Sequence, residues 1–369
     1  MKNTKKRINV TKSYLPTMSK YQSYLQQIWT NGQLTNNGPF LKKLEIELKS
    51  FLGIKNISLV SNGCMALQLA IKALKIKGEI ITTPFSYVAT TNAILWEGCT
   101  PVFVDINDQS LCINAKLIEE KITKNTRAIL ATHVYGNPCD VKEVDRIAKK
   151  NNLKVIYDAA HAFSVKINKQ SILNFGDASI LSFHPTKLFH TIEGGAVICK
   201  DKKNVKEANL LKSFGHIGEE RYLAVGINGK MSEFQAAMGL CNLDEIEDLI
   251  FKRRKISLLY DKKLNDLIND RVIRKQDIDV CVDYNYAYYP VIFRSKALML
   301  KAKKALEDQG IYPRRYFYPS LNKLPFINTY QSCPISEDIS LRVLCLPFYD
   351  DLSDSEIKRI VRIITVSVT

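Results

Sequence analysis

A lysine near the middle of the chain stands in an unusual setting. Lys187 ends the run Leu-Ser-Phe-His-Pro-Thr-Lys at 181–187, and Glu-Gly-Gly-Ala follows at 193–196. A lysine amine held in a desolvated cleft can form a Schiff base, because burial lowers its pKa toward neutral. The glycine pair allows close backbone approach or a positive φ. Most lysines are solvated surface charges, however, and the spacing alone favours that interpretation.

A carboxylate also stands where ligands bind in α/β proteins. The run Lys-Val-Ile-Tyr-Asp at 154–158 is typical of a buried strand, and Asp158 would lie at its carboxyl end. In a pyridoxal enzyme, a carboxylate there would pair with the protonated pyridine nitrogen and strengthen the ring as an electron sink. The alternative is an aspartate that caps the next helix.

A turn of small residues is the third feature. The run Val-Ser-Asn-Gly-Cys-Met-Ala-Leu at 60–67 connects an expected strand to an expected helix. The free N–H groups of a helix N-terminus bind phosphate. A plain strand–helix connection would have the same composition, so this turn decides nothing by itself.

The elements that must position these residues alternate along the chain. We expect strands at 57–60, 79–83, 101–105, 127–132 and 154–158. We expect helices at 65–74, 87–96, 116–122 and 141–151. Short β-rich runs between helices predict an α/β fold whose mostly parallel sheet is covered on both faces.

A break is expected after an acidic helix at 243–250. Beyond it we predict a connecting helix at 251–267, strands at 286–293 and 343–346, and helices at 296–309 and 354–364, the last capped by Ser353. This pattern divides the chain into an N-terminal segment with a large domain, 1–250, and a smaller α+β domain, 251–369.

The composition, 46% apolar and 24% charged, is ordinary for a soluble globular protein. The 369 residues carry a formal charge of +16, but the lysines are dispersed and no nucleic-acid module accompanies them. The basic run 1–7 is not followed by an apolar stretch, and no run is long enough to span a bilayer. Nine single cysteines without a Cys-x-x-Cys pair argue against disulfides and a zinc site. We expect a cytoplasmic protein with no metal, no nucleic-acid partner and no membrane partner.

The three features follow one another as phosphate turn, aspartate and lysine. From 34–39 (Leu-Thr-Asn-Asn-Gly-Pro) to 345–349 (Cys-Leu-Pro-Phe-Tyr), and above all over 182–195, the chain resembles the DegT/DnrJ/EryC1/StrS family of sugar-nucleotide aminotransferases. The resemblance implies the fold-type I, aspartate aminotransferase-like architecture. It also implies pyridoxal 5'-phosphate as the cofactor, with pyridoxamine phosphate as its second form.

The resemblance assigns roles to individual residues. It makes Lys187 the catalytic lysine that binds the cofactor covalently, and Asp158 the partner of the pyridine nitrogen. It implies cofactor contacts for Gly63, Cys64, Tyr87, His161, Ser182 and Asn228. The first two and Ser182 would hold the phosphate, Tyr87 would stack on the ring, and His161 would lie near the ring hydroxyl. The family usually has Thr or Ser at Cys64 and often Gln at His161, so a side-chain hydroxyl contact at 64 is lost.

The resemblance further implies a homodimer with shared active sites, because Asn228 matches an asparagine that reaches the neighbouring subunit's cofactor phosphate. The usual amino donor of this family is L-glutamate.

Within the family, the chain looks most like enzymes that aminate C-4 of a dTDP-4-keto-6-deoxy sugar, on the runs 8–11, 34–40 and 313–319. Such enzymes form dTDP-4-amino-4,6-dideoxyglucose. Family analogy suggests that this product serves O-antigen or other lipopolysaccharide biosynthesis. A C-3 aminotransferase is the alternative. A dehydratase would replace Lys187 by histidine, and a basic binding protein would not need the site motif. Expected substrate contacts, each equally open to a surface or packing role, are Arg314, Arg315, Tyr316, Tyr318 and His190.

Overall fold

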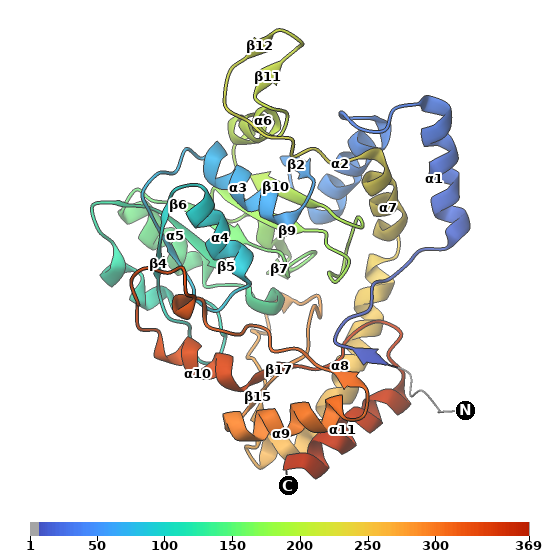
Figure 1. The fold of residues 1–369 in the computed structure, drawn as a ribbon, viewed down its shortest axis with the longest axis vertical. Helices are drawn as coiled ribbons and strands as arrows, with labels where there is room; N and C mark the ends of the chain where they lie inside the picture. The colour runs from blue at the N-terminus through green and yellow to red at the C-terminus, as the bar shows by residue number, and fades with distance from the viewer. Residues whose placement is uncertain (1–6, 369) are drawn as a thin grey trace.

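Short runs rich in Ile, Val and Ala form a seven-stranded sheet in the computed structural model, which describes residues 7–368 (Figure 1). Its spatial order is β2 (Ile57–Val60), β10 (Gly195–Cys199), β9 (Ala178–Ser182), β6 (Lys154–Asp158), β5 (Thr126–Thr132), β3 (Glu79–Thr82) and β4 (Thr100–Phe103). Strand β10 is antiparallel to both neighbours, and the other neighbouring pairs are parallel. The expected mixed, mostly parallel sheet is confirmed.

Helices cover both faces of this sheet because its strands are apolar on both sides. Along β5, Ile129 and Ala131 join one core while Ala128 and Leu130 join the other, as the two-residue period of a strand requires. One face is covered by α2 (Pro39–Leu52), α5 (Val141–Lys150) and α7 (Glu233–Leu243). The opposite face is covered by α3 (Gly63–Ala73), α4 (Val88–Trp96) and α6 (Lys202–Leu211). The α1 helix (Met18–Asn31) packs against α7 (Figure 1).

Strand β4 ends the sheet, and one side chain from the C-terminal part lies along it. Gln331 Oε1 accepts a hydrogen bond from the Phe103 amide at 2.8 Å, and Gln331 Nε2 donates to the Pro101 carbonyl at 3.1 Å. The side-chain amide therefore makes the two bonds that a neighbouring strand would make there.

A second apolar core lies beyond the large sheet. It is built on the antiparallel strands β13 (Ile273–Arg274), β15 (Pro290–Phe293) and β17 (Val343–Cys345). The helices α8 (Ile246–Asn269), α9 (Lys296–Glu307) and α11 (Asp354–Val368) pack on these strands. Strand β1 (Ile8–Asn9) pairs with β16 (Ile311–Tyr312), so the start of the described chain joins this second core (Figure 1).

The expected break near residue 250 is absent from α8, which runs unbroken from Ile246 to Asn269. Its buried residues recur every three or four positions, and no proline or glycine interrupts them. Ile246 and Leu249 belong to the large core, whereas Ile256 and Tyr260 belong to the second. The prediction of two helices was wrong, and the proposed domain division after residue 250, still a prediction, falls inside one helix.

Most other expected elements are present. The predicted helix at 116–122 is instead two 3₁₀ turns, Ala115–Leu117 and Glu119–Lys121, because so short a segment gains little from helix propagation. Ser353 does cap the last helix, since its Oγ accepts from the Glu356 amide at 3.3 Å. All nine cysteines are unpaired. Among residues 7–368, no helix has the length and apolar character needed to cross a bilayer.

Candidate active site

A cavity of about 510 Å³ opens at the carboxyl ends of β6 and β9. The α3 and α4 N-termini border it, and residues from the C-terminal part close one side. The predicted site residues that line it are Gly63, Cys64, Tyr87, Asp158, His161, Ser182, Lys187, Arg314 and Tyr316. Segments far apart in the sequence thus meet around one space.

Lys187 follows β9 in a tight turn in which its amide donates to the His184 carbonyl at 2.8 Å. Its side chain is partly buried and lines the same cavity as Asp158. Burial lowers the pKa of Lys187 to about 8, although the Asp158 charge acts in the opposite direction. An amine with this pKa is more often unprotonated near neutral pH than an ordinary lysine, and can act as a nucleophile or a base.

Asp158 ends β6 and is held by a chain of hydroxyl groups. Its Oδ2 accepts from Thr90 Oγ1 at 2.7 Å, and its Oδ1 accepts from the Ala160 amide at 3.1 Å. Thr90 Oγ1 lies 2.8 Å from Ser86 Oγ, which accepts from Thr132 Oγ1 at 3.0 Å. Burial raises the pKa of Asp158, and the hydrogen bonds from Thr90 and Ala160 oppose that rise. The carboxylate is thus fixed and kept from water.

His161 has a defined orientation in an aromatic setting. Its Nδ1 accepts a hydrogen bond from the Tyr135 amide at 3.2 Å, so the ring proton lies on Nε2. Its ring is parallel to that of Phe317 with centroids 5.7 Å apart. Burial lowers the pKa of His161 well below its usual range, and the Lys187 charge lowers it further. His161 is therefore a neutral donor within the cavity lining.

The small-residue turn provides free amides next to a hydroxyl. Asn62 caps α3, since its Oδ1 accepts from the Met65 amide at 2.9 Å. Gly63 and Cys64 begin the helix, so their N–H groups have no acceptor within it. A Cβ on Gly63 would lie 2.8 Å from Ser182 Cβ. Only glycine allows the turn to approach the Ser182 hydroxyl this closely.

Three other predicted residues lie outside this cavity. The Arg315 Nη2 donates to the carbonyls of Ser340 and Leu341, and its guanidinium carbon lies 3.4 Å from the Tyr318 ring centroid. His190 is buried, with Nε2 2.7 Å from the Tyr14 carbonyl. In this chain Arg315, Tyr318 and His190 make packing contacts, and their substrate contacts stay predictions.

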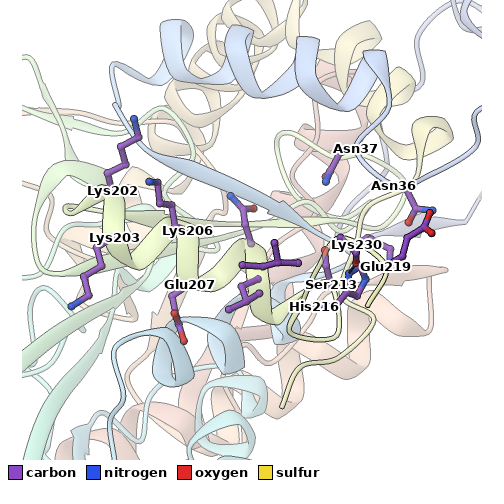
Figure 2. Close-up of a pocket in the computed structure, with 14 residues that line it drawn as sticks. Asn36, Asn37, Lys202, Lys203, Lys206, Glu207, Ser213, His216, Glu219 and Lys230 are labelled. Carbon is purple, nitrogen blue, oxygen red and sulfur yellow. Dashed lines mark hydrogen bonds between the residues drawn. The ribbon is translucent and has the colours of Figure 1, made fainter. Parts of the chain in front are cut away.

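Asn228 is exposed on the surface and lies outside the Lys187 cavity of its own chain. Its Oδ1 accepts from Lys230 Nζ at 2.7 Å. Figure 2 shows Lys230 in a second, open cavity of about 1010 Å³, near Ser213 and His216. In this chain Asn228 therefore lies outside the lining of the Lys187 cavity, and its contact with a cofactor phosphate stays a prediction.

The sequence reasoning missed Ser86, Thr90 and Thr132, which hold Asp158. Thr90 lies three residues after Tyr87, so its place on the same face of a helix start was a usable signal. Thr132 ends β5 beside the end of β6, and only the sheet order reveals that proximity.

The comparisons with known proteins agree with this geometry. Residues 17–365 match the DegT/DnrJ/EryC1/StrS aminotransferase family. The chain is 42% identical over 361 residues, 96% of its length and 98% of the relative's, to a dTDP-4-amino-4,6-dideoxy-D-glucose transaminase of Shigella dysenteriae. It is 40% identical to an Escherichia coli transaminase of the same name, over 97% of this chain and 98% of that one.

A solved structure of DesI in the presence of its TDP-sugar product is similar with a TM-score of 0.92 and 28% identity, over 98% of this chain and 93% of that one. The chain belongs to the DegT/DnrJ/EryC1/StrS aminotransferase family.

This membership makes the chain an aminotransferase that uses pyridoxal 5'-phosphate. The cavity fits that group on its own evidence. The close approach at Gly63 leaves amides and a hydroxyl for a phosphate, buried Asp158 offers a charge for a ring nitrogen, and neutral His161 offers a donor for a ring oxygen. Lys187 lines the same space and offers the amine.

Proposed function

We propose that this aminotransferase moves an amino group from L-glutamate to C-4 of a dTDP-4-keto-6-deoxyglucose-type nucleotide sugar, giving dTDP-4-amino-4,6-dideoxyglucose. The observation that carries the proposal is the 42% and 40% identity to two transaminases named for that product, each matched over nearly its whole length. The cavity that Lys187 lines together with Asp158, His161 and Ser182 supports the proposal.

When bound, pyridoxal phosphate supplies an aldehyde that accepts the amino group and a ring that withdraws electrons. Lys187 Nζ takes a proton from Cα of the amino donor and later returns one to the sugar carbon. Its lowered pKa suits both tasks, and a positioned base of this kind contributes about 10²–10⁴-fold. Asp158, fixed by Thr90, presents its carboxyl group to the cavity, where it would pair with the ring nitrogen. Arg314, whose guanidinium carbon lies 4.2 Å from the Tyr316 ring centroid, binds a substrate oxyanion.

Product analysis tests this proposal directly. The purified protein is incubated with the dTDP-4-keto-6-deoxy sugar and L-glutamate, and NMR locates the new amino group. We expect amination at C-4 and release of 2-oxoglutarate. Amination at C-3 of a 3-keto isomer, with none at C-4, would instead establish the C-3 alternative.

Borohydride reduction tests the assignment of Lys187. Reduction of the yellow holoenzyme should fix the cofactor to one peptide, and mass spectrometry should place it on Lys187. In Lys187→Ala, covalent labelling should disappear. A cofactor found on another lysine would refute the assignment.

We also propose that the active unit is a homodimer with shared sites. Asn228 lies beside the hairpin of β11 (His216–Ile217) and β12 (Arg221–Tyr222), which extends from the body of the fold (Figure 1). This segment exposes apolar side chains, with exposed fractions of 72% at Tyr222 and 86% at Val225. Exposed apolar surface of this extent is typical of a protein interface.

Subunit mixing tests this proposal. Lys187→Ala and Asn228→Ala are unfolded and refolded together. If Asn228 serves the neighbouring site, each mixed dimer contains one intact site, and the mixture should recover about one quarter of the wild-type activity. If Asn228 serves its own site, no activity returns. The same proposal includes a cytoplasmic location and a product used in O-antigen or other lipopolysaccharide biosynthesis, on family analogy.

A further inference from the structure

His184 and Glu193 line the cavity from the two ends of the segment that contains Lys187. His184 Nε2 and Glu193 Oε1 are 3.7 Å apart, which is longer than a hydrogen bond. Their side chains are 45% and 53% exposed, and within residues 7–368 neither of these two atoms has a hydrogen-bond partner. A third polar atom that lies to one side of the pair, on the cavity side, can be within hydrogen-bond distance of both.

The imidazole of His184 is fixed with its donor toward Glu193. Its Nδ1 accepts from the Thr186 amide at 3.2 Å and lies 2.8 Å from Thr186 Oγ1. Since Nδ1 accepts, the ring proton lies on Nε2. Burial lowers the pKa of His184, although the Glu193 charge opposes this, so the ring is neutral at pH 7. His184 therefore presents one N–H donor.

The backbone of Glu193 is also fixed. Its carbonyl accepts from Thr191 Oγ1 at 2.7 Å and from Gln235 Nε2 at 2.6 Å. A Cβ on the next residue, Gly194, would overlap Thr191 Oγ1, so the chain can turn here only with glycine. The carboxylate is thus presented to the cavity from an anchored backbone. It is an acceptor beside the His184 donor.

A donor and an acceptor this close match a hydroxyl group, which can accept from one and donate to the other. L-Glutamate offers no hydroxyl, and its carboxylates would be repelled by Glu193. A keto sugar does carry hydroxyls, one of them beside its carbonyl carbon. His184 and Glu193 line the same cavity as Lys187, and besides burial the Lys187 charge lowers the pKa of His184, so the pair faces the space in which the amine acts at the carbonyl carbon.

We propose that His184 and Glu193 are a specificity-determining pair that binds the sugar hydroxyl next to the carbonyl carbon. The inference rests on the proposed function, under which this is the C-3 hydroxyl, because C-5 carries the methyl group. His184 Nε2–H donates to the hydroxyl oxygen, and the hydroxyl donates to Glu193 Oε1. The pair distinguishes the acceptor sugar from the amino donor.

The two half-reactions separate these roles, because each can be followed by the cofactor's absorbance. Glu193→Ala should lower kcat/KM for the keto sugar by about 10- to 100-fold, the cost of a hydrogen bond to a charged group. Its half-reaction with L-glutamate should stay within about twofold of wild type, since the donor makes no contact with the pair. His184→Ala should act in the same direction. The double variant should lose less than the product of the two single losses, because both side chains hold one hydroxyl.

A substrate without the hydroxyl supplies the decisive control. With the corresponding 3-deoxy keto sugar nucleotide, wild type and Glu193→Ala should have equal kcat/KM. Glu120→Ala, at an exposed carboxylate outside the cavity, should match wild type throughout. The proposal is overturned if Glu193→Ala slows both half-reactions equally, or if its defect persists with the 3-deoxy substrate. Failure of the proposed function is distinct, because wild type itself would then not aminate C-4.

Discussion

The amine of Lys187 is subject to two opposing charges. Burial lowers its pKa to about 8, Asp158 raises it and Arg314 lowers it. We therefore expect Asp158→Asn to shift the pKa of Lys187 further down and Arg314→Gln to shift it up. The measurement is the rate of Lys187 acylation against pH in cofactor-free protein, followed by mass spectrometry. Equal midpoints in the two variants would show that neither charge acts on the amine.

Lys212 is a fully buried lysine that lies outside the Lys187 cavity. Its Nζ donates to the Leu59 carbonyl at 2.9 Å, and burial lowers the pKa of Lys212 from 10.5 to about 8. Between pH 8 and 10.5, Lys212 is therefore protonated in the unfolded chain but largely unprotonated in the folded one. Because the unfolded chain binds more protons there, the free energy of unfolding rises as the pH increases from about 8 to 10.5. Below pH 8 the protonated amine is a cost that an uncharged residue avoids.

Lys212→Met should remove this dependence. The free energy of unfolding of wild type, relative to the variant, should rise by up to about 3 kcal/mol over that pH range. Urea unfolding at several pH values measures it. Lys203→Met, at an exposed lysine of the preceding helix, should leave the curve unchanged. If the free energies of unfolding of wild type and Lys212→Met changed in parallel with pH, the pKa of Lys212 would not be lowered by folding.

Among the elements, the start of α2 depends on a carboxylate from α7. Glu233 Oε2 accepts from the Phe40 amide at 2.8 Å, and Oε1 accepts from the Leu41 amide at 3.0 Å. These charge-assisted bonds satisfy two free amides of the helix N-terminus. A Cβ on Gly38 would overlap the carboxyl group of Glu233.

Gly38→Ala should accordingly destabilise the protein by about 2 kcal/mol, because Glu233 must move and leave buried amides unpaired. In a Glu233→Ala background the same change should cost little, since the overlap is gone. Denaturant unfolding of the four proteins gives the coupling. Equal costs in both backgrounds would rule out the contact as the cause.

The elements also show where sequence reasoning succeeds. Strands such as β5 and β6 were predictable because they are short, apolar and bounded by turns. The alternation of strands and helices predicted the α/β class, whereas the family resemblance, carried above all by 182–195, was needed to single out Lys187 among the lysines. Thr90 and Thr132, which hold Asp158, are uncharged and belong to no recognisable sequence pattern, so the sequence did not single them out. Thr132 reaches Ser86 only because its strand β5 lies next to β3, the strand that precedes Ser86, in the sheet. For His190 the sequence left a pocket role and core packing equally open, and in the structure its side chain is buried with Nε2 near the Tyr14 carbonyl.

At the scale of the whole molecule, Glu337 ties the C-terminal part together. Glu337 lies in the first turn of α10 (Pro334–Arg342). Its Oε1 accepts hydrogen bonds from Tyr330 Oη and Asn322 Nδ2 at 2.7 Å each, and its Oε2 forms an ion pair with Lys323 Nζ at 2.6 Å. Burial alone would raise the pKa of Glu337, but these partners lower it to about 2. Its stabilising contribution is therefore present above the ordinary value of 4.5 and is lost as the pH falls toward 2.

Glu337→Gln should reduce the free energy of unfolding by roughly 1–3 kcal/mol at pH 7, and by progressively less as the pH approaches 2. Thermal unfolding against pH measures this. Asp338→Asn, at a more exposed carboxylate paired with Arg342, is the matched control and should change little. A Glu337→Gln defect that persists unchanged in acid would trace to packing, not to charge.

The side chain of Gln331 has a consequence for how copies of this protein behave at high concentration. An exposed edge strand can pair with strands of other molecules, and such pairing can start aggregation. Here the margin at Pro101 and Phe103 already has its donor and acceptor taken by an amide from the same chain. Intermolecular strand addition at this site must first displace Gln331, so the folded protein resists self-association there.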